Sequence, residues 1–185
     1  IVADIEHHEI IAYNLKDGSV AWRYLTGGRM DVSPTIYKGI CFAGDRTGYV
    51  YALKVKTGEL LYTLRVAPQE KRMVSHGTLE SVWPVLGGVL IHNGKAYAAA
   101  GRAEGSDGGL VIRAFMPETG KHIWSQATVN KGVRETRQND ILLVEGGKLR
   151  ITQSYFDLET GAHVQSPIID YLMLAHPKET QAIID

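Results

Sequence analysis

The side chains with the clearest potential to bind a ligand lie in long connecting segments rather than in the apolar runs of the sequence. Charged groups there could contact a polar ligand, and one tryptophan could stack on a sugar or a base. The same groups could instead join the long loops through ion pairs, with the tryptophan in the core. Both interpretations stand, and the candidate ligand-binding residues are Asp31, Arg72, Glu80, Trp83, Arg102 and Asp107.

The seven histidines do not have the spacing of a metal site. No H-x-x-x-H or H-E-x-x-H motif occurs, and the adjacent His7 and His8 would point to opposite faces of a strand. The single cysteine, Cys41, lies in the apolar run 40–43 and is expected to be a buried small hydrophobe. There is no G-x-G-x-x-G motif, P-loop or G-x-S-x-G elbow. We therefore expect no catalytic residue, no metal ligand and no cofactor-binding residue.

Length and charge limit the class of protein. The 185 residues suffice for one domain with a hydrophobic core, so residues 1–185 are treated as a single unit. Lys and Arg total 20, as do Asp and Glu, and this zero net charge argues against a nucleic-acid partner. No apolar run approaches the about 18 residues that a membrane span needs. The 20 glycines favour a β-rich protein with many chain reversals.

A strand–turn–strand motif recurs, with its turn glycine at Gly18, Gly58, Gly120 and Gly161. The spacings are 40, 62 and 41 residues, and a period near 40 with short strands is typical of propeller blades. The glycine follows an Asp or a Thr, as turn chemistry favours, and in the first three copies an Ala lies six residues before it. Four residues after the glycine these copies carry a ring expected to wedge between blades: Trp22, Tyr62 and Trp124.

The repeat divides the chain into four units and two insertions. We expect blades at residues 1–25 (partial), 32–64, 84–126 and 139–165, followed by a tail at 166–185. The spacing of 62 residues places extra chain at 65–83 and 102–109. Within the first insertion, residues 68–78 are the best candidate for a helix, although they lack a period of about 3.6 residues. The chain starts with Ile1 in a strand-like stretch without the pattern of a signal peptide, so we expect it to be a segment of a longer protein.

The pattern Ala-x-x-x-x-[Asp/Thr]-Gly-x-x-x-[Trp/Tyr] resembles the tryptophan-docking motif of the PQQ-like, quinoprotein-type β-propellers. Residues 26–36, 80–85, 100–102 and 107–109 resemble a subgroup found in large bacterial PQQ-like repeat proteins of unassigned function. The resemblance implies an all-β fold, a partial β-propeller of about three to four four-stranded blades, or half of an eight-bladed ring. The family's usual Asp four residues before the glycine is present only as Asp157.

The resemblance implies a periplasmic or secreted, non-catalytic scaffold that binds a protein or a carbohydrate through inserted loops and sheet edges. The remaining half of the propeller is the expected partner, supplied by the same polypeptide, a second copy or a partner protein. The alternative is the propeller portion of a secreted or periplasmic PQQ-type oxidoreductase whose active site lies outside this segment. Quinone-dependent relatives commonly use adjacent cysteines and a calcium ion, whereas this chain has one cysteine and no calcium-site spacing.

Overall fold

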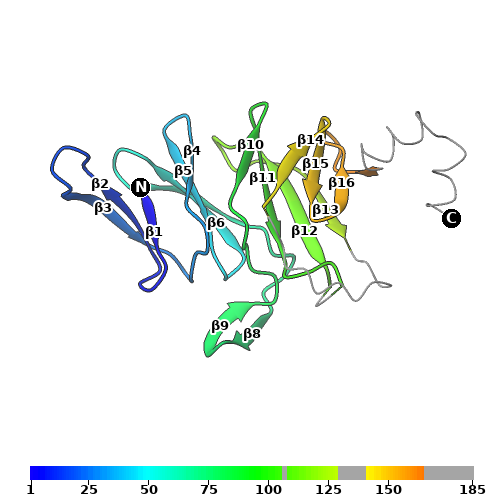
Figure 1. Cartoon of the computed structure of the whole chain (residues 1–185), viewed down its shortest axis with the longest axis horizontal. Coiled ribbons are helices and arrows are strands. Elements are labelled where there is room, and N and C mark those ends of the chain that lie inside the picture. The colour runs from blue at the N-terminus through cyan, green and yellow to red at the C-terminus, as the bar shows by residue number, and fades with distance from the viewer. Residues whose placement is uncertain (106–107, 129–140, 165–185) are drawn as a thin grey trace, which may run out of the picture.

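In the computed structural model, which describes residues 1–105, 108–128 and 141–164, the chain folds into antiparallel sheets arranged side by side in chain order (Figure 1). The first sheet has three strands: β1 (Val2–Asp4), β2 (Glu9–Tyr13) and β3 (Val20–Leu25). The second has four: β4 (Thr35–Tyr37), β5 (Ile40–Gly44), β6 (Tyr49–Lys54) and β7 (Leu60–Arg65).

Two further four-stranded sheets continue the series. One contains β10 (Leu90–His92), β11 (Lys95–Ala100), β12 (Leu110–Phe115) and β13 (His122–Thr128). The other contains β14 (Leu143–Glu145), β15 (Lys148–Ile151), β16 (Ser154–Phe156) and β17 (His163–Val164). Within each sheet, every strand pairs with its neighbour in sequence, as short hairpins dictate. The all-β, partial-propeller architecture that the sequence predicted is therefore confirmed.

Register shows which strand the first sheet lacks. Ala12 on β2 pairs with Trp22 on β3, as Ala52 on β6 pairs with Tyr62 on β7. The strands β1, β2 and β3 therefore correspond to β5, β6 and β7, and the first sheet has no counterpart of β4 among the described residues.

Neighbouring sheets are joined by the repeated aromatic residue on the last strand of each of the first three sheets. Trp22 Nε1 donates a hydrogen bond to the Val55 carbonyl of the next sheet (2.9 Å). The Tyr62 hydroxyl and Trp124 Nε1 do the same to the carbonyls of Pro117 (2.6 Å) and Leu158 (3.1 Å). Each acceptor lies three residues before a turn glycine. The ring thus docks forward onto the turn of the following blade, which confirms the predicted wedge.

The turn glycine is required by this contact as well as by its backbone conformation. Gly58, Gly120 and Gly161 have φ near +70°, and a Cβ on each would lie 2.4–2.8 Å from the docked ring of the preceding sheet. Gly18 has the same φ of 72°, yet a Cβ there would meet nothing within 4 Å. The first blade therefore presents the same turn with no ring docked on it.

Apolar side chains fill the spaces between consecutive sheets in three clusters. Cys41 belongs to the first of these spaces, with no exposed surface, as the sequence predicted. Burial raises the pKa of its thiol to about 11, so it is protonated at neutral pH and acts as a packing group.

Replacing Tyr62 by alanine removes both the ring that packs on Gly120 and the hydroxyl bonded to Pro117. We expect Tyr62→Ala to lower the free energy of unfolding by about 2–4 kcal/mol, the range for losing a large packed side chain. Tyr62→Phe, which keeps the ring, should cost about 1 kcal/mol for the hydrogen bond alone. Urea denaturation separates the two, and equal losses would contradict the packing role of the ring.

Candidate functional site

The first insertion folds into a β-hairpin that projects from one long side of the row of sheets, near the middle of the row (Figure 1). Its strands are β8 (Arg72–Ser75) and β9 (Thr78–Ser81), joined by His76 and Gly77 with φ of 49° and 80°. Two consecutive residues with positive φ are the signature of a tight type I′ hairpin turn. The helix considered for residues 68–78 is therefore wrong, because this turn reverses the chain inside the segment.

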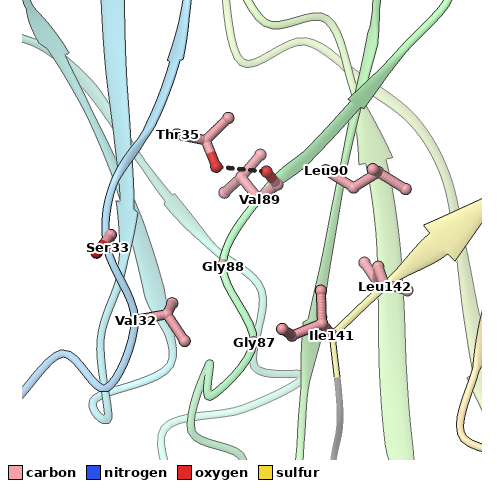
Figure 2. A pocket seen from close by; sticks show the side chains of 9 residues that line it. All are labelled: Val32, Ser33, Thr35, Gly87, Gly88, Val89, Leu90, Ile141 and Leu142. Carbon is pink, nitrogen blue, oxygen red and sulfur yellow. Dashed lines mark hydrogen bonds between the residues drawn. The ribbon is translucent and has the colours of Figure 1, made fainter.

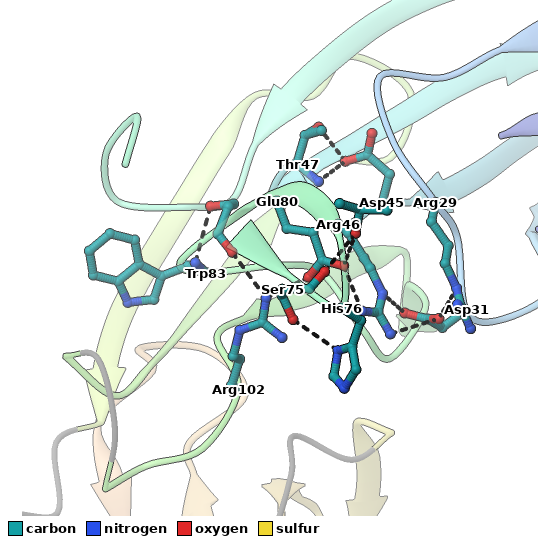
Figure 3. A network of polar contacts seen from close by, with 12 residues as sticks. Arg29, Asp31, Asp45, Arg46, Thr47, Ser75, His76, Glu80, Trp83 and Arg102 are labelled. Atoms are coloured by element: carbon teal, nitrogen blue, oxygen red, sulfur yellow. Dashed lines mark hydrogen bonds and ion pairs between the residues drawn. The ribbon is translucent and has the colours of Figure 1, made fainter. Parts of the chain in front are cut away.

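Glu80 holds the base of the hairpin to the propeller through two arginines (Figure 3). Its side chain is 4% exposed, and Arg46 Nη1 donates to Oε1 at 2.7 Å while Arg102 Nη2 donates to Oε2 at 2.5 Å. Arg46 also binds Asp31 through two nitrogens, Nε at 2.7 Å and Nη2 at 3.1 Å. Arg29 Nε completes the set with a bond to Asp31 at 2.9 Å. We call Arg29, Asp31, Arg46, Glu80 and Arg102 the ion-pair network.

Each carboxylate of the network is paired with arginine side chains. Burial alone would raise the pKa of Glu80, but hydrogen bonds from Arg102 and Arg46 outweigh it and hold the pKa below its ordinary value. The hydrogen bond to Asp31 in turn raises the pKa of Arg46. Both carboxylates are bound by arginine, so the network supplies no free general base, and its direct effect is to fix the hairpin.

Three of the six residues singled out in the sequence meet in this network: Asp31, Glu80 and Arg102. Arg46, which joins Asp31 to Glu80, was not singled out, because it lies in a short turn between β5 and β6 and not in one of the long insertions. Its charge beside Asp45 in an otherwise apolar hairpin is the one signal that could have found it.

Two more of the singled-out residues, Trp83 and Arg72, are not members of the network. Trp83 is 6% exposed and packs in the core between the second and third sheets, so its ring face is not on the surface. Its Nε1 is buried without a hydrogen-bond partner in the described part of the chain. Arg72 is exposed on β8. Asp107 lies outside the described residues.

One face of the hairpin exposes apolar side chains to solvent. Val74 and Leu79 are cross-strand partners, 72% and 59% exposed, and alternation along the strands places Arg72 on the same face. The opposite face carries Met73, which packs on the core, and Glu80. Because this apolar pair is exposed on a hairpin that protrudes and is anchored at its base, we take this face as a candidate contact surface.

A trough runs beside this face. Two adjoining hollows of about 230 Å³ and 300 Å³ share Gly27 and Thr47, with Leu79 lining the first and Arg72 lining the second. The trough's wall is fixed by Tyr51, whose hydroxyl accepts from Gly27 N at 2.9 Å and donates to Asp45 at 3.1 Å. Burial, then the charge of Asp45, raise the pKa of Tyr51 to about 12, so this hydroxyl stays protonated.

A separate apolar pocket of about 190 Å³ lies where the first strands of three successive sheets begin (Figure 2). Its hydroxyl groups are those of Ser33 and Thr35, and Thr35 already donates to the Val89 carbonyl at 2.7 Å. Few polar groups remain to orient a ligand, which makes this pocket a weaker candidate than the trough. In the described ranges, no three His, Cys, Asp or Glu side chains gather as a metal site.

The fold and its docked aromatic residues define a PQQ-like repeat β-propeller. The sequence matches, over residues 1–106, the family described as outer membrane protein assembly factor BamB, and the chain belongs to this family. No curated protein sequence matches the chain.

Solved structures of similar fold are quinohemoprotein alcohol dehydrogenases. The one from Pseudomonas putida is 17% identical, with a TM-score of 0.65 over 85% of this chain. That from Comamonas testosteroni is 21% identical, with a TM-score of 0.53 over 64% of this chain. The chain spans only 31% and 18% of these two proteins, and at such identities the likeness is one of fold. Across the described residues, no helix is long and apolar enough to cross a membrane.

Proposed function

We propose that this chain is a non-catalytic propeller scaffold that binds a partner protein through the hairpin β8–β9. The observation that carries the proposal is the combination of a base fixed by the ion-pair network with an exposed Val74–Leu79 pair at the free end. A rigid element loses little conformational entropy when a partner covers it. Little of the free energy gained by burying its apolar area is therefore offset by ordering.

A protein partner fits these features better than a carbohydrate. Sugar sites rely on exposed aromatic faces, and Trp83, the tryptophan nearest the hairpin in sequence, is buried. The hairpin instead offers branched aliphatic side chains beside an arginine, the composition of a protein contact surface with a charged rim.

Site-specific photocrosslinking tests the proposal in the full-length protein within its native cells. A benzophenone amino acid at Leu79 is expected to give a discrete crosslinked protein. The same group at Lys56, exposed in the β6–β7 turn at the opposite end of the blade, is the matched control and should give none. Absence of a Leu79 product, or equal products at both positions, would overturn the proposal.

We also propose that a preceding blade completes the ring at the first sheet. The carbonyl of Leu15 lies three residues before Gly18, in the place where Val55 accepts from Trp22, and Leu15 is fully exposed. The Leu15 carbonyl could therefore accept a hydrogen bond from a Trp or Tyr on the last strand of a preceding blade. That blade would come from the rest of a longer polypeptide, a second copy or a partner. In the assembly that supplies the aromatic side chain docked on Gly18, Gly18→Ala should lower the free energy of unfolding as much as Gly58→Ala does. A clearly smaller loss at Gly18 in that assembly would count against the proposal.

Extracytoplasmic placement, periplasmic or secreted, is proposed from the family description, which names outer membrane protein assembly. The chain is similar in fold to quinohemoprotein alcohol dehydrogenases, so one enzymatic function is the alternative. In that case the chain is the propeller portion of an oxidoreductase whose active site lies outside this segment. Alcohol-dependent dye reduction by the full-length protein with added PQQ and Ca²⁺ would favour the oxidoreductase over the scaffold.

A further inference from the structure

The two edges of the hairpin β8–β9 can be told apart from its hydrogen-bond pattern. Val82 N donates to the Lys71 carbonyl at 2.9 Å, so these two residues form a hydrogen-bonded pair. Antiparallel pairs alternate, so the backbone groups of Arg72, Val74, Leu79 and Ser81 point away from the hairpin. Ser81 bears this out, because its N–H donates outward to the Arg46 carbonyl at 2.8 Å.

This bond joins the edge of β9 to the second blade, whereas the edge of β8 is open. Among the described residues no strand pairs with β8 other than β9, and the outward N–H and C=O groups of Arg72 and Val74 have no backbone partner. Arg72 and Val74, two residues apart on β8, thus offer their backbone donors and acceptors along one edge. An extended chain that is added to a sheet bonds to such backbone groups.

The side chains along β8 change in character from its base to its tip. Lys71 and Arg72 are exposed at the base, and neither forms an ion pair of 4.0 Å or less within the part of the chain that the structure describes. The nearby Glu70 is bonded to the Tyr49 hydroxyl and lies 3.7 Å from Arg65. Towards the tip follow Met73 and the exposed Val74. The edge therefore offers positive charge at one end and apolar surface at the other.

We propose that the open edge of β8 accepts an extended peptide segment as a third strand, with two apolar residues beside Met73 and Val74 and two acidic residues beside Arg72 and Lys71. This assignment rests on the proposed protein-binding function and names the chemistry of the partner segment. Backbone hydrogen bonds supply the affinity, and the charge at the base selects acidic over basic segments.

The cations on β8 have a second interpretation. Lys and Arg on an edge strand often serve to prevent pairing with another chain. Protection predicts that no segment binds, whereas recognition predicts that an acidic one does, so binding measurements separate the two.

Proline substitution gives a matched pair of variants for the test. Val74→Pro removes an N–H that points out of the hairpin on the β8 edge, and Leu79→Pro removes its counterpart on the β9 edge. Neither proline breaks an internal hairpin bond, since both residues form a non-hydrogen-bonded pair, and each variant loses one side chain of the same apolar pair.

The probe is a fluorescein-labelled ten-residue peptide with a central Val-Val-Glu-Glu sequence, together with its Lys-for-Glu analogue, measured by fluorescence anisotropy. We expect saturable binding of the acidic peptide, weakened at least about tenfold by Val74→Pro and less than about threefold by Leu79→Pro, with tenfold corresponding to 1.4 kcal/mol. The Lys analogue should bind at least about tenfold more weakly.

No binding of the acidic peptide, equal binding of the Lys analogue, or equal effects of the two prolines would overturn the edge assignment. Protection of the Val74 amide from hydrogen exchange in the complex is a second, independent readout, and its absence would have the same force. A Leu79 crosslink in cells combined with failure of these peptide experiments would leave the scaffold function standing and remove only the strand-addition mode.

Discussion

Alanine at Gly58 is expected to lower the free energy of unfolding by about 2–4 kcal/mol, the sum of strain at positive φ and overpacking against a ring. A Cβ there would lie 2.7 Å from Trp22 Cδ2 and 2.9 Å from its Cγ. The ring cannot swing aside without breaking the Nε1 bond to the Val55 carbonyl. The contact therefore has to be relieved by moving two blades apart.

Gly18→Ala is the matched control, because Gly18 has the same φ of 72° in the same turn but no atom within 4 Å of the added Cβ. Gly18→Ala should lower the free energy of unfolding by about 1 kcal/mol, the cost of placing a side chain at positive φ alone. Denaturant unfolding of both variants in the 185-residue chain measures the difference directly. Equal losses at Gly18 and Gly58 would mean that blade-to-blade docking contributes little to stability.

The blade motif was accessible from sequence because most of its information is local. A short polar residue followed by glycine specifies the turn within a few residues of Ala12 or Ala52, and the period of about 40 residues repeats it. The direction of docking was not accessible. That Tyr62 rests on Gly120 and not on Gly18 depends on the order of blades in space, which no single motif encodes.

The hairpin β8–β9 was missed although a signal was present. His76-Gly77 is a two-residue connection between Ser75 and Thr78, the arrangement of a tight hairpin, but a histidine is uncommon in the first turn position. The sequence singled out three members of the ion-pair network, Asp31, Glu80 and Arg102, but not the arginine that links them. Arg46 contacts Asp31 and Glu80 across 15 and 34 residues of sequence, and such pairing is fixed only when the tertiary fold brings the loops together.

Glu80, the central carboxylate of the network, should be sensitive to substitution, because it is buried and bound by two arginines. We expect Glu80→Ala to lower the free energy of unfolding by about 2–4 kcal/mol, because it leaves Arg102 with only the Ser81 carbonyl at 3.4 Å and Arg46 with only the Asp31 carboxylate. Glu59→Ala, which removes the exposed ion pair with Lys54, is the matched control and should cost less than about 1 kcal/mol.

The pH dependence of the Glu80 contribution follows from the direction of its pKa shift. The folded-state pKa lies below the ordinary value of 4.5, so the ionised form is favoured by folding. Its stabilisation is fully present above pH 4.5 and is lost as the pH falls through the folded-state pKa. The stability difference between wild type and Glu80→Gln should therefore be constant from pH 7 to about pH 5 and shrink in stronger acid.

Urea unfolding of the wild type and of Glu80→Gln at several pH values provides this comparison. A difference that grows as the pH falls would mean that burial, which raises the Glu80 pKa, outweighs its two arginine bonds. The hairpin would then be held by packing at Met73, and not by charge. In that case Glu80→Gln would leave the Val74–Leu79 surface in place, and peptide binding to β8 should survive the substitution unchanged.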